Sequence, residues 1–269
     1  MRDDADVQAW VRTAERAARA GWNALRPYWD RTRALEVSAK GTHDFVTEAD
    51  LASQRAITAL LAAEHPEHLV LGEEGEGARL AGGGPVWIVD PLDGTTNFIH
   101  GNPVFGVSVG CWYRGRIVAG AVFDPLRDEM YTAVRGGGAR CNGERLAVSN
   151  RPGLDEALVG TGFPFRRIER LERYLGAFRE VLTRASGIRR PGSASIDLAW
   201  VAAGRYDGFW EEGLGPWDVA AGSLLIEEAG GVVSDFAGGD DWLTGGTFVA
   251  GAPGVHRELR AVVARHEAR

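Results

Sequence analysis

The chain has 269 residues, of which 45% are hydrophobic and 25% charged, so it is long enough for one large α/β domain or two closely joined lobes. Its apolar runs fall well short of the roughly 18 residues that a membrane span needs, and its net charge of −7 argues against a broad nucleic-acid surface. The N-terminus has no signal pattern, and Cys111 and Cys141 lack the spacing of a disulfide framework or zinc site, so a cytoplasmic location is expected.

The N-terminal segment predicts two helices. Apolar residues at three- and four-residue spacing indicate an amphipathic helix over 4–30 that stops near Pro27. The segment KGTHDFVTEAD is expected to form a turn. The second helix should begin near Thr47, with Asp50 in its first turns.

Strands are predicted next, and the first two end in acidic residues. HLVLGEEG is a short strand that ends in Glu73 and Glu74, and VWIVDP is a strand that ends in Asp90. Several short β-runs broken by turn sequences then follow over 105–149. They are typical of an antiparallel meander.

The second half alternates strands and helices. EALVGTG, DGFWEEG, GVVSDF and TFVAGA are predicted strands, and a helix is expected near 168–186. IRRPGSASIDLAWVAAG should be a turn leading into an apolar helix. PWDVAAGSLLIEEAGG, with proline at its start and glycines at its end, and the tail GVHRELRAVVARHEAR complete the helices. The expected fold class is α+β, a layered α-β-α-β-α sandwich with lobes 1–150 and 151–269.

Carboxylates gather at the predicted strand ends and helix starts. They are Asp44, Asp50, Glu73, Glu74, Asp90, Asp93 and Asp218. Two ionised carboxylates about 4 Å apart repel by about 4 kcal/mol at an effective dielectric constant of 20, so a converged set needs cations. All-oxygen ligand sets suit Mg²⁺ or Mn²⁺. Each acid taken alone is better explained as a helix cap or a solvated strand end, but this explanation weakens for the whole set.

Lys40 is the only lysine, and it lies just before the first acidic motif. Lys40 could lie near the metal-rich mouth of the site, or it could be a solvated surface lysine. The sequence leaves both alternatives open.

Two predicted elements beside the acids can bind an anion. The turn Gly94-Thr95-Thr96 offers backbone N–H groups, and the helix that starts near Pro216 presents its positive end. Hard metal ions beside an anion site indicate phosphoryl chemistry, and Thr95 within reach of Asp50 could orient an attacking water. Hydrolysis of a phosphate monoester is the simplest reaction.

Four ordered motifs carry a family resemblance over essentially the whole chain. They are DFVTEAD at 44–50, GEE at 72–74, DPLDGTTNF at 90–98 and PWDVAAGSLLIEEAGG at 216–231. The sequence resembles the inositol monophosphatase family of Mg²⁺-dependent, lithium-sensitive phosphatases. This implies the layered fold of inositol monophosphatase and fructose-1,6-bisphosphatase. Lobe 1–150 would carry the metal-binding motifs, and lobe 151–269 would complete the site. The site would hold two or three Mg²⁺ ions, which Mn²⁺ can replace.

The resemblance also implies a role for each matching residue. The metal ligands would be Glu73, Asp90, the Leu92 carbonyl, Asp93 and Asp218. Thr95 with Asp50 would activate the water. Glu74 would be a further acid of the catalytic set, either behind the ligands or at an additional ion, and Asp44 would be a supporting residue of the motif at 44–50. The substrate would contact Asp93, Gly94, Thr95, Asp218, the turn Gly192-Ser193-Ala194, and Glu211, which accepts hydrogen bonds from polyol hydroxyls.

The resemblance favours an inositol-1-monophosphatase that converts myo-inositol phosphate and water to inositol and phosphate. Fructose 1,6-bisphosphate, histidinol phosphate and 3'-phosphoadenosine 5'-phosphate are alternative substrates. Because members of this family form dimers, the resemblance also predicts a homodimer, and its substrate would be a small phosphorylated polyol. The net charge and the short apolar runs predict binding to neither nucleic acid nor membrane.

Two other classes of protein share features with this sequence. A haloacid-dehalogenase phosphatase also has an Asp-Gly-Thr signature but needs an aspartate nucleophile where this chain has Pro91. A regulatory binding protein that keeps the fold is the remaining alternative, although the motif residues that catalysis needs are all present.

Overall fold

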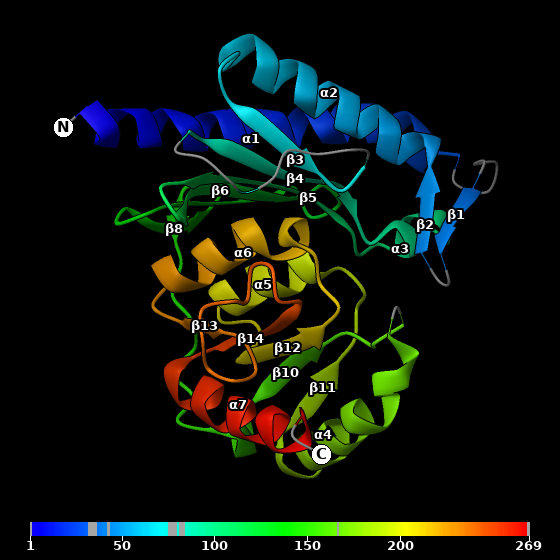
Figure 1. Ribbon diagram of the computed structural model, residues 1–269, viewed down its shortest axis with the longest axis vertical. Helices are drawn as coiled ribbons and strands as arrows, with labels where there is room; N and C mark the ends of the chain where they lie inside the picture. Colours follow the sequence, from blue (N-terminus) through cyan, green and yellow to red (C-terminus); the bar gives the residue numbers. More distant parts are fainter. Residues whose placement is uncertain are drawn as a thin grey trace.

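The computed structural model describes residues 2–31, 37–41, 44–74, 80, 84–165 and 167–267, and for residues 2–6, 37–41 and 44–46 it describes the backbone alone. Helices and sheets alternate in five layers (Figure 1). The outer helices are α1 (Arg2–Trp29) and α2 (Glu48–Glu64) on one side, and α4 (Leu171–Arg184) and α7 (Pro253–Glu267) on the other. The α-β-α-β-α sandwich expected from the sequence is confirmed.

The larger sheet has, within the described ranges, seven strands in the order β3-β4-β5-β6-β7-β8-β9. β3 (Leu69–Gly72) pairs parallel with β4 (Val86–Asp93), and the other pairings are antiparallel. The predicted meander is confirmed as β5 (Gly106–Tyr113), β6 (Arg116–Asp124), β7 (Glu129–Val134), β8 (Gly138–Cys141) and β9 (Glu144–Arg145). Every residue of β4 is buried, because helices cover both faces of the sheet.

In the part of the chain that the structure describes, the smaller sheet has five strands in the order β11-β10-β12-β14-β13. They are β10 (Leu158–Thr161), β11 (Gly187–Arg189), β12 (Gly208–Glu212), β13 (Val232–Ser234) and β14 (Thr247–Gly251). β10 runs parallel to both of its neighbours, whereas β14 is antiparallel to both of its own. Short 3-10 helices at Leu154–Glu156 and Ile168–Arg170 complete this half.

The middle layer consists of α5 (Ala194–Ala202) and α6 (Pro216–Glu228). α6 is apolar on all sides, and residues 218–226 are all buried because the helix contacts both sheets. The loops that precede α5 and α6 therefore lie between the sheets. This arrangement brings the second half of the chain to the end of β4.

The first helix ends at Trp29, two residues past Pro27, close to where the sequence predicts its end. Two other local predictions need correction. The segment expected as a turn before α2 instead holds the end of β1 (Val37–Gly41) and all of β2 (Asp44–Thr47), which pair with each other. The segment before α5 contains β11, a three-residue edge strand too short to give a pattern.

No described helix combines the length and the apolar character that crossing a bilayer requires.

Candidate active site

The end of β4 brings two aspartates to one place. In a regular strand, residues three apart point to opposite faces. The pairing of β4 with β5 shifts register between Asp90 and Asp93, and this irregularity turns Asp93 toward the same side as Asp90. Gly94 follows with a left-handed φ of 91°, and helix α3 (Thr95–Ile99) begins immediately.

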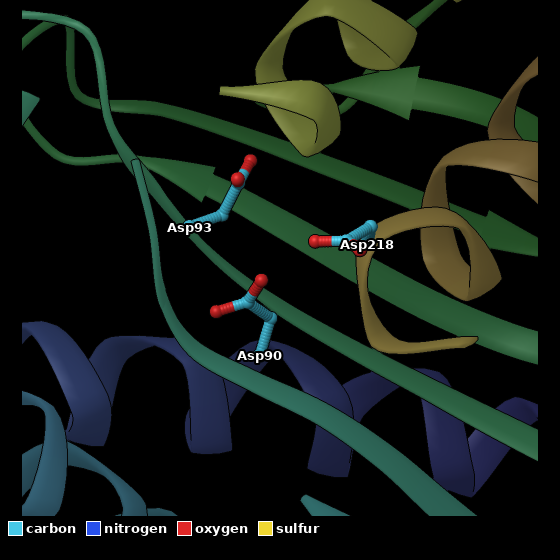
Figure 2. A group of neighbouring side chains, drawn as sticks. All are labelled: Asp90, Asp93 and Asp218. Atoms are coloured by element: carbon cyan, nitrogen blue, oxygen red, sulfur yellow. The ribbon is translucent and has the colours of Figure 1, made fainter. Parts of the chain in front are cut away.

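Asp218 completes an acidic cluster with these two residues. Ligand oxygens of Asp90, Asp93 and Asp218 all lie within 4.8 Å of one another. Figure 2 shows Asp218 reaching from the start of α6 toward the two aspartates of β4. The Gly215 N–H donates to Asp218 Oδ2 at 2.6 Å, which fixes the carboxylate in the first helical turn.

The environment of the cluster disfavours negative charge in the absence of a cation. Burial, followed by the charges of Glu73, Asp93 and Asp218, raises the pKa of Asp90 well above its usual range. Burial also raises the pKa of Asp93, although several hydrogen bonds oppose this effect. Three close, buried, oxygen-only ligands fit a hard divalent ion such as Mg²⁺.

Asp93 is anchored to the start of α5. Its Oδ2 accepts hydrogen bonds from Ser193 Oγ at 2.6 Å, Ser195 N at 2.7 Å and Ser195 Oγ at 2.6 Å. Ser193 was predicted as a substrate neighbour, whereas Ser195 was not singled out. Its position just inside a predicted helix, where a serine often binds an acceptor or a backbone group, was the available signal.

Thr95 and Asp50 are brought together as the sequence predicts. Thr95 Oγ1 donates to Asp50 Oδ1 at 3.0 Å and also lies 3.1 Å from the Leu92 carbonyl oxygen. The other Asp50 oxygen accepts from Thr47 N at 2.9 Å and Thr47 Oγ1 at 2.5 Å in a capping box. This box orients the fully buried Asp50 carboxylate, and burial raises its pKa.

A cavity of about 320 Å³ contains the acidic cluster. Among the described residues, seven acidic and two basic side chains line it, an excess of negative charge that cations must offset before a phosphate can enter. Most residues predicted for the site line this cavity: Glu73, Asp90, Leu92, Asp93, Gly94, Thr95, Gly192, Ser193, Ala194, Glu211 and Asp218.

Glu74 and Asp50 are absent from the described lining. The Glu74 carbonyl accepts a hydrogen bond from Gln54 at 3.3 Å, and Asp50 reaches the cavity through Thr95. The side chains of Lys40 and Asp44 lie outside the described part of the structure.

The outer wall of the cavity is aromatic. Phe163 and Phe165 are 39% and 41% exposed, and the Arg190 guanidinium carbon lies 5.2 Å from each ring centroid. The sequence predicts that substrate specificity comes from Glu211 and from the residues around 161–165 and 189–195, and these segments include Phe163, Phe165 and Arg190. The contact of Arg190 with the two rings is not evident from the sequence.

Comparison with known proteins identifies close relatives along the whole chain. The model described as "Inositol monophosphatase family" matches residues 6–268. Nus factor SuhB of Pseudomonas aeruginosa is 48% identical over 264 residues, 97% of each chain, and Inositol-1-monophosphatase of Rhizobium meliloti is 47% identical over 247 residues, 92% of each chain. The crystal structure of extragenic suppressor protein suhB from Bartonella henselae superimposes with a TM-score of 0.88 at 40% identity, covering 96% of this chain and 98% of that one.

Proposed function

The chain belongs to the inositol monophosphatase family, and from this premise we propose that it is a Mg²⁺-dependent phosphatase that hydrolyses an inositol monophosphate to inositol and phosphate. The observation that carries the proposal is the cluster of Asp90, Asp93 and Asp218 beside the Thr95–Asp50 pair. A relative that is 47% identical bears the name Inositol-1-monophosphatase, which supports the choice of substrate.

The acidic cluster would hold the ions, together with Glu73 and the Leu92 carbonyl. Bound divalent ions supply positive charge that stabilises the leaving oxygen and makes a water easier to deprotonate. The cluster keeps its carboxylates in place by hydrogen bonds to Gly215 and Ser195, so little reorganisation is needed. Glu74 would contribute as a further acid behind Glu73.

Thr95 and Asp50 would handle the proton of the attacking water. The Thr95 hydroxyl oxygen accepts a hydrogen bond from the water while its own proton points to Asp50 Oδ1, 3.0 Å away. The capping box holds the Asp50 carboxylate in this orientation. Because burial raises the pKa of Asp50, this carboxylate is a better proton acceptor than an exposed aspartate.

Backbone groups would hold the phosphate, and the loop before α5 would hold the alcohol. The N–H groups of Gly94 and Thr95 and the start of α6 provide positive partial charge next to the cluster. The turn Gly192-Ser193-Ala194 and Glu211 face the same cavity from the other side. Glu211 would accept hydrogen bonds from the hydroxyls of the polyol.

The test is a panel of phosphate monoesters assayed with and without Mg²⁺. Hydrolysis of inositol 1-phosphate should require Mg²⁺, stop on addition of a chelator and be inhibited by lithium. Activity that survives the chelator would contradict the metal mechanism. If the protein hydrolyses another monoester faster, that compound would be the substrate in place of inositol phosphate, and the proposed chemistry would stand. The alternatives to test are fructose 1,6-bisphosphate, histidinol phosphate and 3'-phosphoadenosine 5'-phosphate.

A partner-binding role is the second candidate function. Relatives 43–48% identical bear the name Nus factor SuhB, which does not describe a phosphatase. An Asp93→Asn variant separates the two roles in the cell that makes the protein. If the variant lacks hydrolysis and still rescues a deletion, binding is the essential role; if it fails to rescue, hydrolysis is.

A homodimer is the proposed assembly. Ile168, Leu175 and Leu182 are 65%, 40% and 54% exposed, and their seven-residue spacing aligns them as an apolar stripe along α4 and the turn before it. A second copy would cover this stripe. Light scattering should report twice the mass of the 28.9 kDa chain, and replacement of all three by serine should give the monomer mass.

A further inference from the structure

Asp197 is a buried acid in the cavity wall with no assigned role. It lies in the first turn of α5, is 2% exposed and lines the cavity. Its Oδ1 is shielded from solvent and has no hydrogen-bond partner among the described residues. A buried polar oxygen without a partner is unfavourable, so a ligand that donates a hydrogen bond here would gain from it.

The low exposure of Asp197 is compatible with contact to a ligand. Asp90 and Asp93, which belong to the acidic cluster, are 1% and 7% exposed in the same cavity. A side chain can therefore line this cavity although very little of its surface is exposed. Asp197 does not belong to the acidic cluster of Asp90, Asp93 and Asp218, so binding of the ions does not require it.

Glu211 lines the same cavity as Asp197. Its carboxylate lies directly over Gly162, where an added Cβ would sit only 1.9 Å from Glu211 Cδ, so the absence of a side chain at residue 162 leaves room for it. Burial, followed by the charges of Glu211 and Asp93, raises the pKa of Asp197 well above its usual range, and the charge of Arg190 opposes this effect. Asp197, Glu211 and Asp93 therefore line one cavity in which their charges act on one another.

We propose that Asp197 binds the alcohol part of the substrate, with Oδ1 accepting a hydrogen bond from a hydroxyl of a phosphorylated polyol next to the hydroxyls bound by Glu211. This inference rests on the proposed phosphatase function and adds a second residue that recognises hydroxyl groups. A substrate without hydroxyls gains nothing from it. Asp197 thus determines specificity and does not take part in the bond-breaking step.

The test compares two substrates and two substitutions. With saturating Mg²⁺, Asp197→Ala should lower kcat/KM for inositol 1-phosphate by about tenfold, as expected for loss of one hydrogen bond, mainly through KM. Phenyl phosphate, which carries no free hydroxyl, should change less than about twofold. Asp197→Asn keeps an acceptor oxygen and should recover most of the lost activity. Asp124→Asn is the matched control, since Asp124 is a 1% exposed acid outside the cavity lining.

The outcomes separate this inference from the proposed function. Equal losses on both substrates, or no loss on either, would overturn the role of Asp197 and leave the phosphatase assignment intact. A parent protein that hydrolyses phenyl phosphate but no polyol phosphate would also overturn it. A parent protein that hydrolyses neither substrate would remove both proposals.

Discussion

At the scale of single residues, Asp93 carries several interactions at once. Three donors from the start of α5 converge on its Oδ2, while the same carboxylate belongs to the acidic cluster. The side chain therefore links the position of α5 to the proposed ion site. An asparagine at this position could accept the hydrogen bonds from the serines with its amide oxygen, but its NH₂ group would then face the ions.

Asp93→Asn should abolish turnover while leaving the protein folded. We expect kcat to fall by at least about 100-fold in saturating Mg²⁺, because the variant loses a charged ligand. Steady-state kinetics and a circular dichroism melt check this, with Asp124→Asn as the buried-acid control. A variant with normal turnover would remove Asp93 from the site.

Thr95 provides a sharper test of the proton path. Thr95→Ala removes the hydroxyl that bonds to Asp50 and should lower kcat by about 100-fold, with little change in KM. Thr95→Ser keeps the hydroxyl and should retain most activity. If the alanine and serine variants lose the same activity, the hydroxyl is not the important group.

At the scale of elements, the contact between α7 and β13 predicts a pH dependence of stability. His256 of α7 is 7% exposed, and its Nε2 lies 3.0 Å from Ser234 Oγ of β13. Burial, with a smaller effect of Arg260, lowers the pKa of His256 to about 4. The unfolded chain binds this proton below about pH 6.5, so the contribution to stability is full above that pH and is lost as the pH falls toward 4.

The measurement is urea unfolding at pH 7 and at pH 5. Between these values His256 should account for about 1–2 kcal/mol of the decrease in the free energy of unfolding. His256→Gln should show a decrease smaller by that amount. Identical decreases in the variant and the parent would contradict a buried neutral histidine.

Elements with strong local signals were predictable, and those fixed by distant contacts were not. β4 and α6 were evident because each is a continuous apolar run with clear ends. β11 and the β1–β2 pair are too short to show a periodicity, so pairing with neighbouring strands decides them. In the site, Asp90 and Asp93 stand in a recognisable motif, whereas Asp197 sits in an apolar helix and only the folded cavity reveals its unpaired oxygen.

At the scale of the whole molecule, ion binding should stabilise the fold. The acidic cluster joins β4 of one sheet to the helical layer that contacts both sheets. At a Mg²⁺ concentration about 100 times the dissociation constant, the free energy of unfolding should rise by about 2.7 kcal/mol. Thermal melts with MgCl₂ and with NaCl of equal ionic strength measure this rise. Asp218→Asn should greatly reduce it, and an equal rise in that variant would place the ions elsewhere.

The shared middle layer has a consequence for how the chain folds. Asp93 and Ser195 are 102 residues apart in the sequence, and α6 contacts both sheets. Contacts between residues so far apart in the sequence form late, because a long loop must close before such a contact adds stability. The active site should therefore mature in the slowest refolding phase, and a fragment ending at residue 150 would expose the sheet face that α6 covers and aggregate instead of folding. Recovery of catalysis thus reports completion of the native topology.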